Sequence, residues 1–456
     1  MFGIVGGHRC DDTCGAFILI TLKEHERPIH RRATIPHSMI VASPIAAKTR
    51  FTSSQLLTVA LMVALSGLSY FDRTIMSIAG PIVMKEFSIS ETAMGTVFSA
   101  FLLSYTILMT PGGWIADRFG PRAVLTISGL GTALLTGLTA YCGKPGLGVL
   151  FGVVPSFLIV RFLLGALTAP LYPSTGRMAA NWIPMTSQGA VQAFIMAGSA
   201  VGAAISPIAF SRMIAAYGWR VSFLLAAAIT AAIYAVWFWS VRDHPPGPAR
   251  PAPKPRAAGN WRLLLTDKDL MLLTLGYFMV NYFEYIFFYW MFYYFGQIRH
   301  LGASETALAT TVLFVTMAVM TPLGGKLSDI LVARKGQKFG RRSVAMTGMA
   351  ISAVLLVLGA GGYGVVTTVA LLSLAMGFAT CSEGPFWAVA IEISGEHVGA
   401  ACGILNTGGN LGGMLAPVLT PMIAAHFGWA GGLYFGSLMV LIGMLTWLLV
   451  DPGKKI

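Results

Sequence analysis

Gly113-Trp-Ile-Ala-Asp117-Arg118-Phe-Gly120-Pro-Arg122 stands between two long apolar runs, and its pattern decides how the rest of the chain is interpreted. A helix that leaves a membrane at Gly113 can approach a neighbour closely, because glycine has no Cβ. The Phe-Gly-Pro step cannot continue a helix, so the chain turns there into the next apolar run. Asp117 and Arg118 then lie at the water boundary, where we expect a charge network that forms and breaks.

A longer and looser version of this pattern occurs in the second half of the chain. Gly325-Lys-Leu-Ser-Asp329 is followed by Arg334 and then by Gly340-Arg341-Arg342. The same device at corresponding places in two halves predicts an internal duplication. We expect the two loops to act as a conformational latch through these residues: Gly113, Asp117, Arg118, Gly120, Arg122, Gly325 and Asp329.

Composition places the chain among membrane proteins. Of its 456 residues, 55% are hydrophobic and 11% are charged, whereas a soluble chain carries about 25% charged residues. A helix needs about 20 apolar residues to cross a bilayer. The sequence predicts an all-α membrane protein with twelve such helices in two pseudo-symmetric six-helix bundles. The predicted spans are 55–80, 92–115, 122–142, 149–172, 187–212, 219–241, 269–296, 304–328, 342–362, 365–390, 397–425 and 429–450.

The formal net charge of +13 is explained by topology. Lysine and arginine gather in alternate loops and at both termini, and such residues mark the cytoplasmic side of a membrane. We therefore expect a multi-pass protein of the inner (plasma) membrane with both termini in the cytoplasm, and no nucleic-acid partner. The expected organisation is a basic, disordered N-terminal tail (1–54), a first bundle (55–241), a Pro-rich linker (242–268), a second bundle (269–450) and a short C-terminal tail (451–456). An alternative natural start is Met39.

Charged residues inside the apolar runs are the main functional candidates, because they are costly in a membrane. The first span contains Tyr70-Phe71-Asp72-Arg73, for which the alternative is a self-neutralising structural pair. The fourth span contains Arg161, whose guanidinium fork can donate two parallel hydrogen bonds to a carboxylate. Thr168 lies seven residues further on, on nearly the same helix face.

Other candidates lie in the fifth, tenth and eleventh spans. Ser199 belongs to a run of small residues, for which close helix packing is the alternative role. Glu383 precedes a Gly-Pro break, and Trp387 and Asn406 follow it. No catalytic set of nucleophile and base and no zinc-ligand spacing is apparent, and the loose cluster from His8 to Cys14 matches no metal pattern. We expect no enzyme activity, no metal and no cofactor.

The two loops resemble the cytoplasmic loop motif of the major facilitator superfamily, between its second and third helices and again between the eighth and ninth. Residues from about 55 to 450 further resemble the anion:cation symporter branch, which includes bacterial sugar-acid transporters and animal organic-anion carriers. The resemblance is carried by Tyr70 to Arg73, Phe98 to Tyr105, Pro111 to Trp114, Arg161, Ala169 to Pro173, Asn281-Tyr, Trp290, Trp387, and Asn406 to Asn410.

In that branch a first-span Asp and a fourth-span Glu take part in proton coupling, with the fourth-span Arg near them. Asp72 and Arg161 match, but Thr168 stands where the Glu is expected. Threonine cannot carry a proton in and out. The resemblance therefore leaves three possibilities: coupling by Asp72 alone, a substitute acid such as Glu383, or a transporter that is not driven by protons.

These observations predict a monomeric secondary transporter that moves a small organic anion, a carboxylate or sugar acid, with protons by alternating access. Asp72 and Glu383 are the predicted proton-coupling residues. The predicted substrate-binding residues are Tyr70, Arg73, Arg161, Ser199, Trp387 and Asn406. The alternatives are a proton-independent facilitator or anion exchanger, and, from another class, a membrane ligand sensor without net transport.

Overall fold

The structure is a computed structural model that describes residues 51–143, 151–245, 261–394 and 397–453. Residues 51–456 form one compact unit. Nearly all of the predicted N-terminal tail, with Met39 and the cluster from His8 to Cys14, and most of the predicted linker lie outside the described residues.

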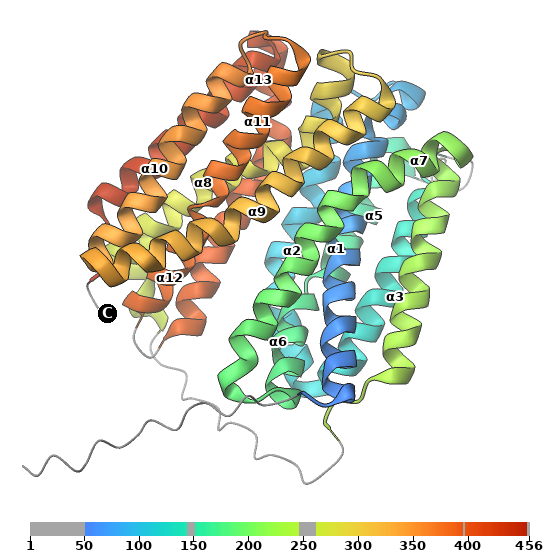
Figure 1. Ribbon diagram of the computed structural model, residues 1–456. Coiled ribbons are helices and arrows are strands. Elements are labelled where there is room, and N and C mark those ends of the chain that lie inside the picture. Colours follow the sequence, from blue (N-terminus) through green and yellow to red (C-terminus); the bar gives the residue numbers. More distant parts are fainter. Residues whose placement is uncertain (1–50, 144–150, 246–260, 395–396, 454–456) are drawn as a thin grey trace, which may run out of the picture. The chain divides into compact units, whose positions relative to one another are not determined.

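The described residues form helices, with two six-helix halves side by side in Figure 1. The first half contains α1 (Ser53–Phe87), α2 (Glu91–Phe119), α3 (Pro121–Thr139), α5 (Val153–Thr168), α6 (Leu171–Trp182) and α7 (Met185–Ser240). The second contains α8 (Lys268–Tyr293), α9 (Ala303–Lys335), α10 (Gln337–Gly359), α11 (Val365–Thr380), α12 (Glu383–Ile393) and α13 (Val398–Leu449). Two short turns, η1 (Trp261–Thr266) and η2 (Tyr294–Ile298), flank α8.

The twelve predicted spans are present. Ten stretches of the described residues are long and apolar enough to cross a membrane, with α5–α6 and α11–α12 each counted as one stretch. Two of the ten, in α7 and α13, are of double length, and each contains one glycine with non-helical geometry: Gly218 (φ 76°) and Gly428 (φ 71°). Divided at these glycines, the ten stretches become twelve spans, as the sequence predicts.

The fourth span continues further than the sequence predicts, to Trp182 instead of residue 172. The chain bends after Thr168, as the prolines suggest, and resumes as α6 at Leu171. Pro173 lies in the first turn of α6, where a missing N–H removes no hydrogen bond. Pro173 therefore does not end the span, which continues through α6 to Trp182.

Glycine contacts show the duplication of the two halves directly. In the first half, Gly198 and Gly202 of α7 pack on the backbone of α1 at Val63 and Gly67. In the second half, glycines with the same four-residue spacing, Gly408 and Gly412 of α13, pack on Thr274 and Phe278 of α8. A Cβ at any of the four would overlap the facing helix, so glycine sets how closely these helix pairs approach.

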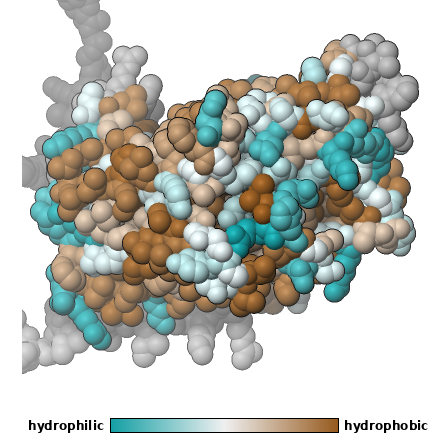
Figure 2. Space-filling model, turned by 90° about the horizontal axis from the view of Figure 1, so that it is seen from above, coloured by the Kyte–Doolittle hydropathy of each residue, from teal (hydrophilic) through white to brown (hydrophobic). Residues whose placement is uncertain are grey.

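The starts of α1, α3 and α10 lie at one end of the unit, which we call the terminus side. The α1–α2 turn and the break within α7 lie at the other end, the opposite side (Figure 1). Figure 2 looks onto the opposite side, where hydrophilic residues (teal) lie between apolar ones (brown).

The two halves are joined at the opposite side. Gly95 of α2 lies against the backbone carbonyl of Pro417 of α13, and a Cβ there would overlap it. The Ser99 hydroxyl donates to the Met414 carbonyl O at 2.6 Å, and the Thr311 hydroxyl donates to the Ala204 carbonyl O at 3.0 Å. At the terminus side, by contrast, the hydrogen bonds and ion pairs between described residues stay within one half.

Candidate functional site

Arg73 reaches from the first half into the second, near the middle of the bundle. Its side chain leaves α1 and its Nη2 donates to the Tyr285 hydroxyl of α8, while its Nε donates to the Tyr289 hydroxyl at 3.4 Å. The guanidinium lies 5.3 Å from the ring centre of Tyr70 and 5.2 Å from that of Phe101. Arg73 is 5% exposed. A buried cation is thus held by hydroxyls and aromatic faces, which favour it without neutralising it.

Arg161 of α5 supplies a second buried cation beside the first. It is 2% exposed, and its Nη2 donates to the backbone carbonyl O of Arg73 at 3.3 Å. Its guanidinium lies 4.9 Å from the ring centre of Phe101, and its Nε has no hydrogen-bond partner. Neither arginine forms an ion pair with an acid of the described residues. Two buried cations without a paired anion form a site that an anion would complete.

Asp72 points to different partners from those of its neighbour Arg73. Its Oδ2 accepts from the Thr230 hydroxyl of α7 at 3.0 Å, its Oδ1 has no partner, and the residue is 2% exposed. The charge of Arg161 acts on it electrostatically. The alternative of a self-neutralising pair between Asp72 and Arg73 is therefore not what the structure contains.

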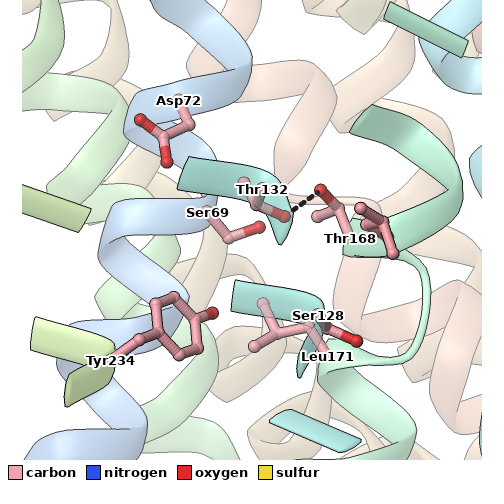
Figure 3. Close-up of a pocket in the computed structure, with 8 residues that line it drawn as sticks. Ser69, Asp72, Ser128, Thr132, Thr168, Leu171 and Tyr234 are labelled. Carbon is pink, nitrogen blue, oxygen red and sulfur yellow. Dashed lines mark hydrogen bonds between the residues drawn. The ribbon is translucent and has the colours of Figure 1, made fainter. Parts of the chain in front are cut away.

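A small pocket connects Asp72 with Thr168, as Figure 3 shows. Its volume is about 10 Å³, close to what one water molecule needs. The Thr168 hydroxyl donates to the Leu164 carbonyl O at 2.7 Å and lies 3.5 Å from the Thr132 hydroxyl. The lining residues are Ser69, Asp72, Ser128, Thr132, Leu167, Thr168, Leu171 and Tyr234. Thr168 thus shares a pocket with Asp72, where the resemblance leads one to expect a second carboxyl.

The second half contributes two acids to the middle of the bundle. Glu383, at the start of α12, accepts from the Tyr277 hydroxyl of α8 at 2.9 Å, and Tyr277 accepts in turn from the Trp387 indole N–H at 3.1 Å. Glu284 of α8 is 7% exposed and interacts electrostatically with Glu383. Tyr70 of the first half interacts with both acids and with Arg73. Tyr70 therefore interacts with Arg73 of its own half and with both acids of the other half.

Asn406 and Ser199 occupy different surroundings. Asn406 of α13 reaches the first half, where its Nδ2 lies 3.3 Å from Met109 Sδ. Ser199 is half-buried and donates to the Met196 carbonyl O at 2.6 Å, directly after the packing residue Gly198. Asn406 lies at the interface between the halves, whereas Ser199 flanks the contact between α7 and α1.

The first loop forms its charge contacts within its own half. Asp117 pairs with Arg177 of α6 (Oδ1 to Nε, 3.6 Å). Arg118 lies over the rings of Trp114 and Phe119 at 5.7 and 5.8 Å. Arg177 was not among the predicted latch residues, because it lies beyond residue 172, where the predicted fourth span ended.

Gly120 takes a positive φ of 86°, as a turn glycine should, and a Cβ there would lie 3.1 Å from the Asp243 carboxylate. The backbone N–H of Arg122 donates to Asp243 Oδ1 at 2.8 Å. Gly113 lies against Pro173: a Cβ added at Gly113 would lie 3.3 Å from the Pro173 Cβ. Asp243 is thus a second loop residue that sequence reasoning missed.

The second loop is more fully paired. Arg341 bonds both Asp329 and Glu392 at 2.6 Å, so one guanidinium joins α9, α10 and α12. Gly325 lies against Gly384 of α12. The chain turns at Gly336 (φ 85°) in this loop, so Gly340 and Arg341 already lie inside α10.

Potential metal ligands do not gather in the part of the chain that the structure describes: no group of three His, Cys, Asp or Glu residues there could hold a metal ion. Cys142, Cys381 and Cys402 are free thiols.

A family model described as Major Facilitator Superfamily matches residues 62–338 and, in a second match, 299–456. A probable sulfoacetate transporter of Cupriavidus necator is 27% identical over 404 residues, which cover 84% of this chain and 91% of that protein. A hexuronate transporter of Bacillus subtilis is 29% identical, with 88% of this chain and 96% of that protein covered. A D-galactonate transporter of Escherichia coli is 27% identical, with 88% and 96% covered.

Solved structures of transporters share the fold. The inward-facing, unoccupied crystal structure of a bacterial homologue of the human lysosomal transporter Spinster gives a TM-score of 0.73 at 15% identity, with 88% of this chain and 98% of that one covered. The crystal structure of a D-xylose–proton symporter gives 0.69 at 20% identity, with 88% and 100% covered.

Proposed function

The chain belongs to the Major Facilitator Superfamily, and from that premise we propose that it moves a small organic anion, a carboxylate or sugar acid, across the inner membrane together with protons. The observation that carries the proposal is the pair of buried arginines, Arg73 and Arg161, which have no acid partner among the described residues. A carboxylate or sulfonate would supply the missing negative charge. The names of the relatives, transporters of sulfoacetate, hexuronate and D-galactonate, support an anionic substrate.

Substrate specificity would come from the groups around the arginines. Arg161 presents an unpaired Nε, and the hydroxyls of Tyr285 and Tyr289 can be displaced from Arg73 by a stronger acceptor. Tyr70 and Trp387 supply aromatic walls, and Asn406 supplies an amide at the interface between the halves. Ser199 contributes a hydroxyl from the α7 side.

Alternating access follows from the way the halves meet. With both termini in the cytoplasm, the terminus side is the cytoplasmic side, and the contacts at Gly95 and Ser99 close the opposite route. Transport requires these contacts to open while the terminus side closes. The first loop would act as a latch in that closed form. Its present pairing of Asp117 with Arg177, inside one half, corresponds to the released state.

Proton coupling is assigned to Asp72 in the first half and Glu383 in the second. Asp72 is buried beside Arg161, so arrival of an anion changes the charge around it. Glu383 and Arg73 both interact electrostatically with Tyr70. Each acid can therefore sense the substrate through charge, without direct contact between them.

The test is uptake into proteoliposomes that contain the purified monomer. Labelled sulfoacetate, hexuronate and D-galactonate are offered with an imposed pH gradient, with and without an ionophore that collapses it. We expect accumulation of at least one of these anions that disappears with the ionophore. Uptake that does not depend on the pH gradient would show that the protein is a facilitator or exchanger and not a proton symporter. Binding without any uptake would favour a membrane ligand sensor instead.

A further inference from the structure

Asn410 of α13 lies between two of the proposed substrate-binding residues without being one of them. It is 6% exposed. Its Nδ2 donates to the Asn406 backbone carbonyl O at 2.9 Å and to the Asn406 Oδ1 at 3.3 Å. Its Oδ1 accepts from the Tyr285 hydroxyl of α8 at 3.5 Å. The donor and the acceptor of this buried amide are therefore both in use, as burial of an amide requires.

These bonds join Arg73 to Asn406 through the second half. The Tyr285 hydroxyl accepts from the Nη2 of Arg73 and donates to Asn410, so it links α1 to α13. At the other end, the Nδ2 of Asn406 returns to the first half at Met109 of α2. The cation that would hold the substrate and the amide at the interface between the halves thus belong to one series of hydrogen bonds.

The packing of α13 against α8 places Tyr285 within reach of Asn410. Gly413 lies three residues after Asn410, and a Cβ there would lie 2.8 Å from the Tyr285 Cδ2. Gly409, on the other side of Asn410, would bring a Cβ to 2.6 Å from the Tyr277 Cε1. A side chain at either glycine would therefore push a tyrosine ring of α8 away from α13.

The bonds of Asn410 decide which way the amide of Asn406 points. An amide carries one oxygen acceptor and an NH₂ group with two donors. Because the Nδ2 of Asn410 donates to the Oδ1 of Asn406, that oxygen is engaged and the Nδ2 of Asn406 faces the first half. Its partner there is the Met109 Sδ at 3.3 Å, and a thioether sulfur is a weak acceptor. An oxygen atom of a substrate would be a better partner for these N–H groups.

We infer that Asn410 is a positioning residue for the substrate. It holds Asn406 as a hydrogen-bond donor and links this donor to the tyrosine that Arg73 contacts. The inference rests on the proposed function, because Arg73 and Asn406 are binding residues there. It adds a requirement: besides the acidic group held by the arginines, the anion must carry a second group with an accepting oxygen, such as a sulfonate or a hydroxyl. An anion with an apolar remainder would displace Met109 and leave the Asn406 donors unpaired.

Binding to the purified full-length protein tests the positioning role. Sulfoacetate, D-galactonate and D-glucuronate, the last as the hexuronate, are titrated into the wild type, Asn410→Leu, Asn406→Leu and the double variant. Leucine has about the size of asparagine but neither donates nor accepts a hydrogen bond. We expect each single variant to lose about tenfold in affinity for the anion that the wild type binds. The double variant should lose no more than either single one, because Asn410 acts through Asn406. Additive losses would overturn the inference.

Asn281→Leu is the matched control. Asn281 of α8 is 7% exposed, and its Nδ2 donates to the Tyr277 carbonyl O at 3.0 Å, four residues earlier, as Asn410 does to Asn406. The control removes a buried amide outside the series from Arg73 to Asn406 and should bind like the wild type. An equal loss of affinity in the control would assign the effect to any buried amide and overturn the inference.

Acetate tests the required second group, since it carries a carboxylate and no other oxygen. In competition with the bound anion, acetate should have the same affinity for the wild type and for Asn410→Leu, because Arg73 keeps its contacts with Tyr285 and Tyr289. A tenfold loss for acetate as well would place the effect of Asn410 at the arginines and refute its action through Asn406.

Thermal unfolding without any anion tests the hydrogen bonds themselves. The effects of Asn410→Leu and Tyr285→Phe on stability should be non-additive, as for residues in one network. Additive effects would overturn the inference even where an anion binds. Normal binding by Asn410→Leu would likewise refute it and leave the proposed function standing. Coupled unfolding, together with a wild type that binds none of the three anions, would instead refute the proposed function and leave the link between Tyr285 and Asn410 in place.

Discussion

Arg161 donates from its Nη2 to the backbone carbonyl O of Arg73 at 3.3 Å, so the two buried arginines are linked through the backbone of α1. This bond holds the Arg161 guanidinium against the α1 backbone at the residue whose side chain is the second cation. Arg73 in turn contacts Tyr285 and Tyr289 of the second half. A change at Arg161 is therefore felt across the interface at which the halves must separate.

The first prediction concerns Arg161. Arg161→Ala should abolish binding of the anion. Leaving a desolvated carboxylate without its buried positive partner costs about 3–5 kcal/mol of binding free energy. Arg161→Lys should restore binding poorly, since a lysine lacks the planar fork and cannot make the same two contacts. Thermal shift of the purified protein with sulfoacetate, hexuronate and D-galactonate measures the binding.

Arg334→Ala is the control for loss of a positive charge, because Arg334 is exposed near the end of α9. It should bind like the wild type. An Arg161→Ala variant that binds its anion with unchanged affinity would remove Arg161 from the site.

The second prediction concerns the first loop. Asp117 and Arg177 form an ion pair whose side chains are 65% and 33% exposed, and such pairs contribute about 0–1 kcal/mol to stability. Asp117→Asn should therefore leave the fold and substrate affinity unchanged while transport slows. Arg177→Gln should slow transport to a similar extent, and the double variant should be no slower than either. Turnover in proteoliposomes, compared with binding to the same preparation, measures the difference.

A parallel loss of binding and expression in Asp117→Asn would indicate misfolding instead of a latch. A normal rate in Arg177→Gln together with a slow Asp117→Asn would show that the structural partner of Asp117 does not matter for transport.

The turns and breaks of the fold could be predicted because they depend on local chemistry. Gly120, with its positive φ, stands where Phe-Gly-Pro predicted a turn, and the bend after Thr168 lies beside Pro170. The end of that span could not be predicted from its hydropathy, since α6 continues as a more polar helix to Trp182. The partner of Asp117 was missed for the same reason, because Arg177 lies in that continuation.

The buried charges were predicted as residues but not as pairs. Asp72 and Arg73 are neighbours in sequence, and successive residues of a helix point about 100° apart. Asp72 therefore meets Thr230 of its own half, while Arg73 meets Tyr285 of the other. The order of residues in the sequence does not show which neighbouring helix each of the two side chains contacts. The electrostatic interaction of Glu284 with Glu383 likewise depends on how α8 packs against α12.

The third prediction uses the contact between Gly95 and Pro417. Gly95→Ala places a Cβ in overlap with the Pro417 carbonyl, so the halves can no longer close at the opposite side as they do here. Overpacking of this kind costs about 1–3 kcal/mol, which corresponds to a population shift of about 5- to 150-fold toward the form closed at the terminus side. Spin labels on the terminus-side ends of α6 and α12 should then show a shorter distance.

Gly403→Ala is the matched control, because a Cβ at Gly403 of α13 meets nothing within 4 Å. It should leave the label distance as in the wild type. An unchanged distance in Gly95→Ala, with the protein folded, would mean that this contact does not hold the opposite side closed.

The last prediction concerns Asp72, the one acid that the resemblance and the structure both place beside Arg161. Asp72→Asn keeps the shape of the side chain and can still contact the Thr230 hydroxyl, but it cannot take up or release a proton. Accumulation driven by a pH gradient should therefore disappear, whereas exchange of anion for anion should persist because it needs no net proton movement. Thr230→Val removes the hydrogen bond and keeps the acid, so it should retain gradient-driven accumulation at a changed rate. Gradient-driven uptake and anion exchange, measured in the same proteoliposomes, test whether Asp72 carries the coupled proton. Accumulation by Asp72→Asn equal to that of the wild type would place proton coupling wholly in the second half, at Glu383 and its neighbours.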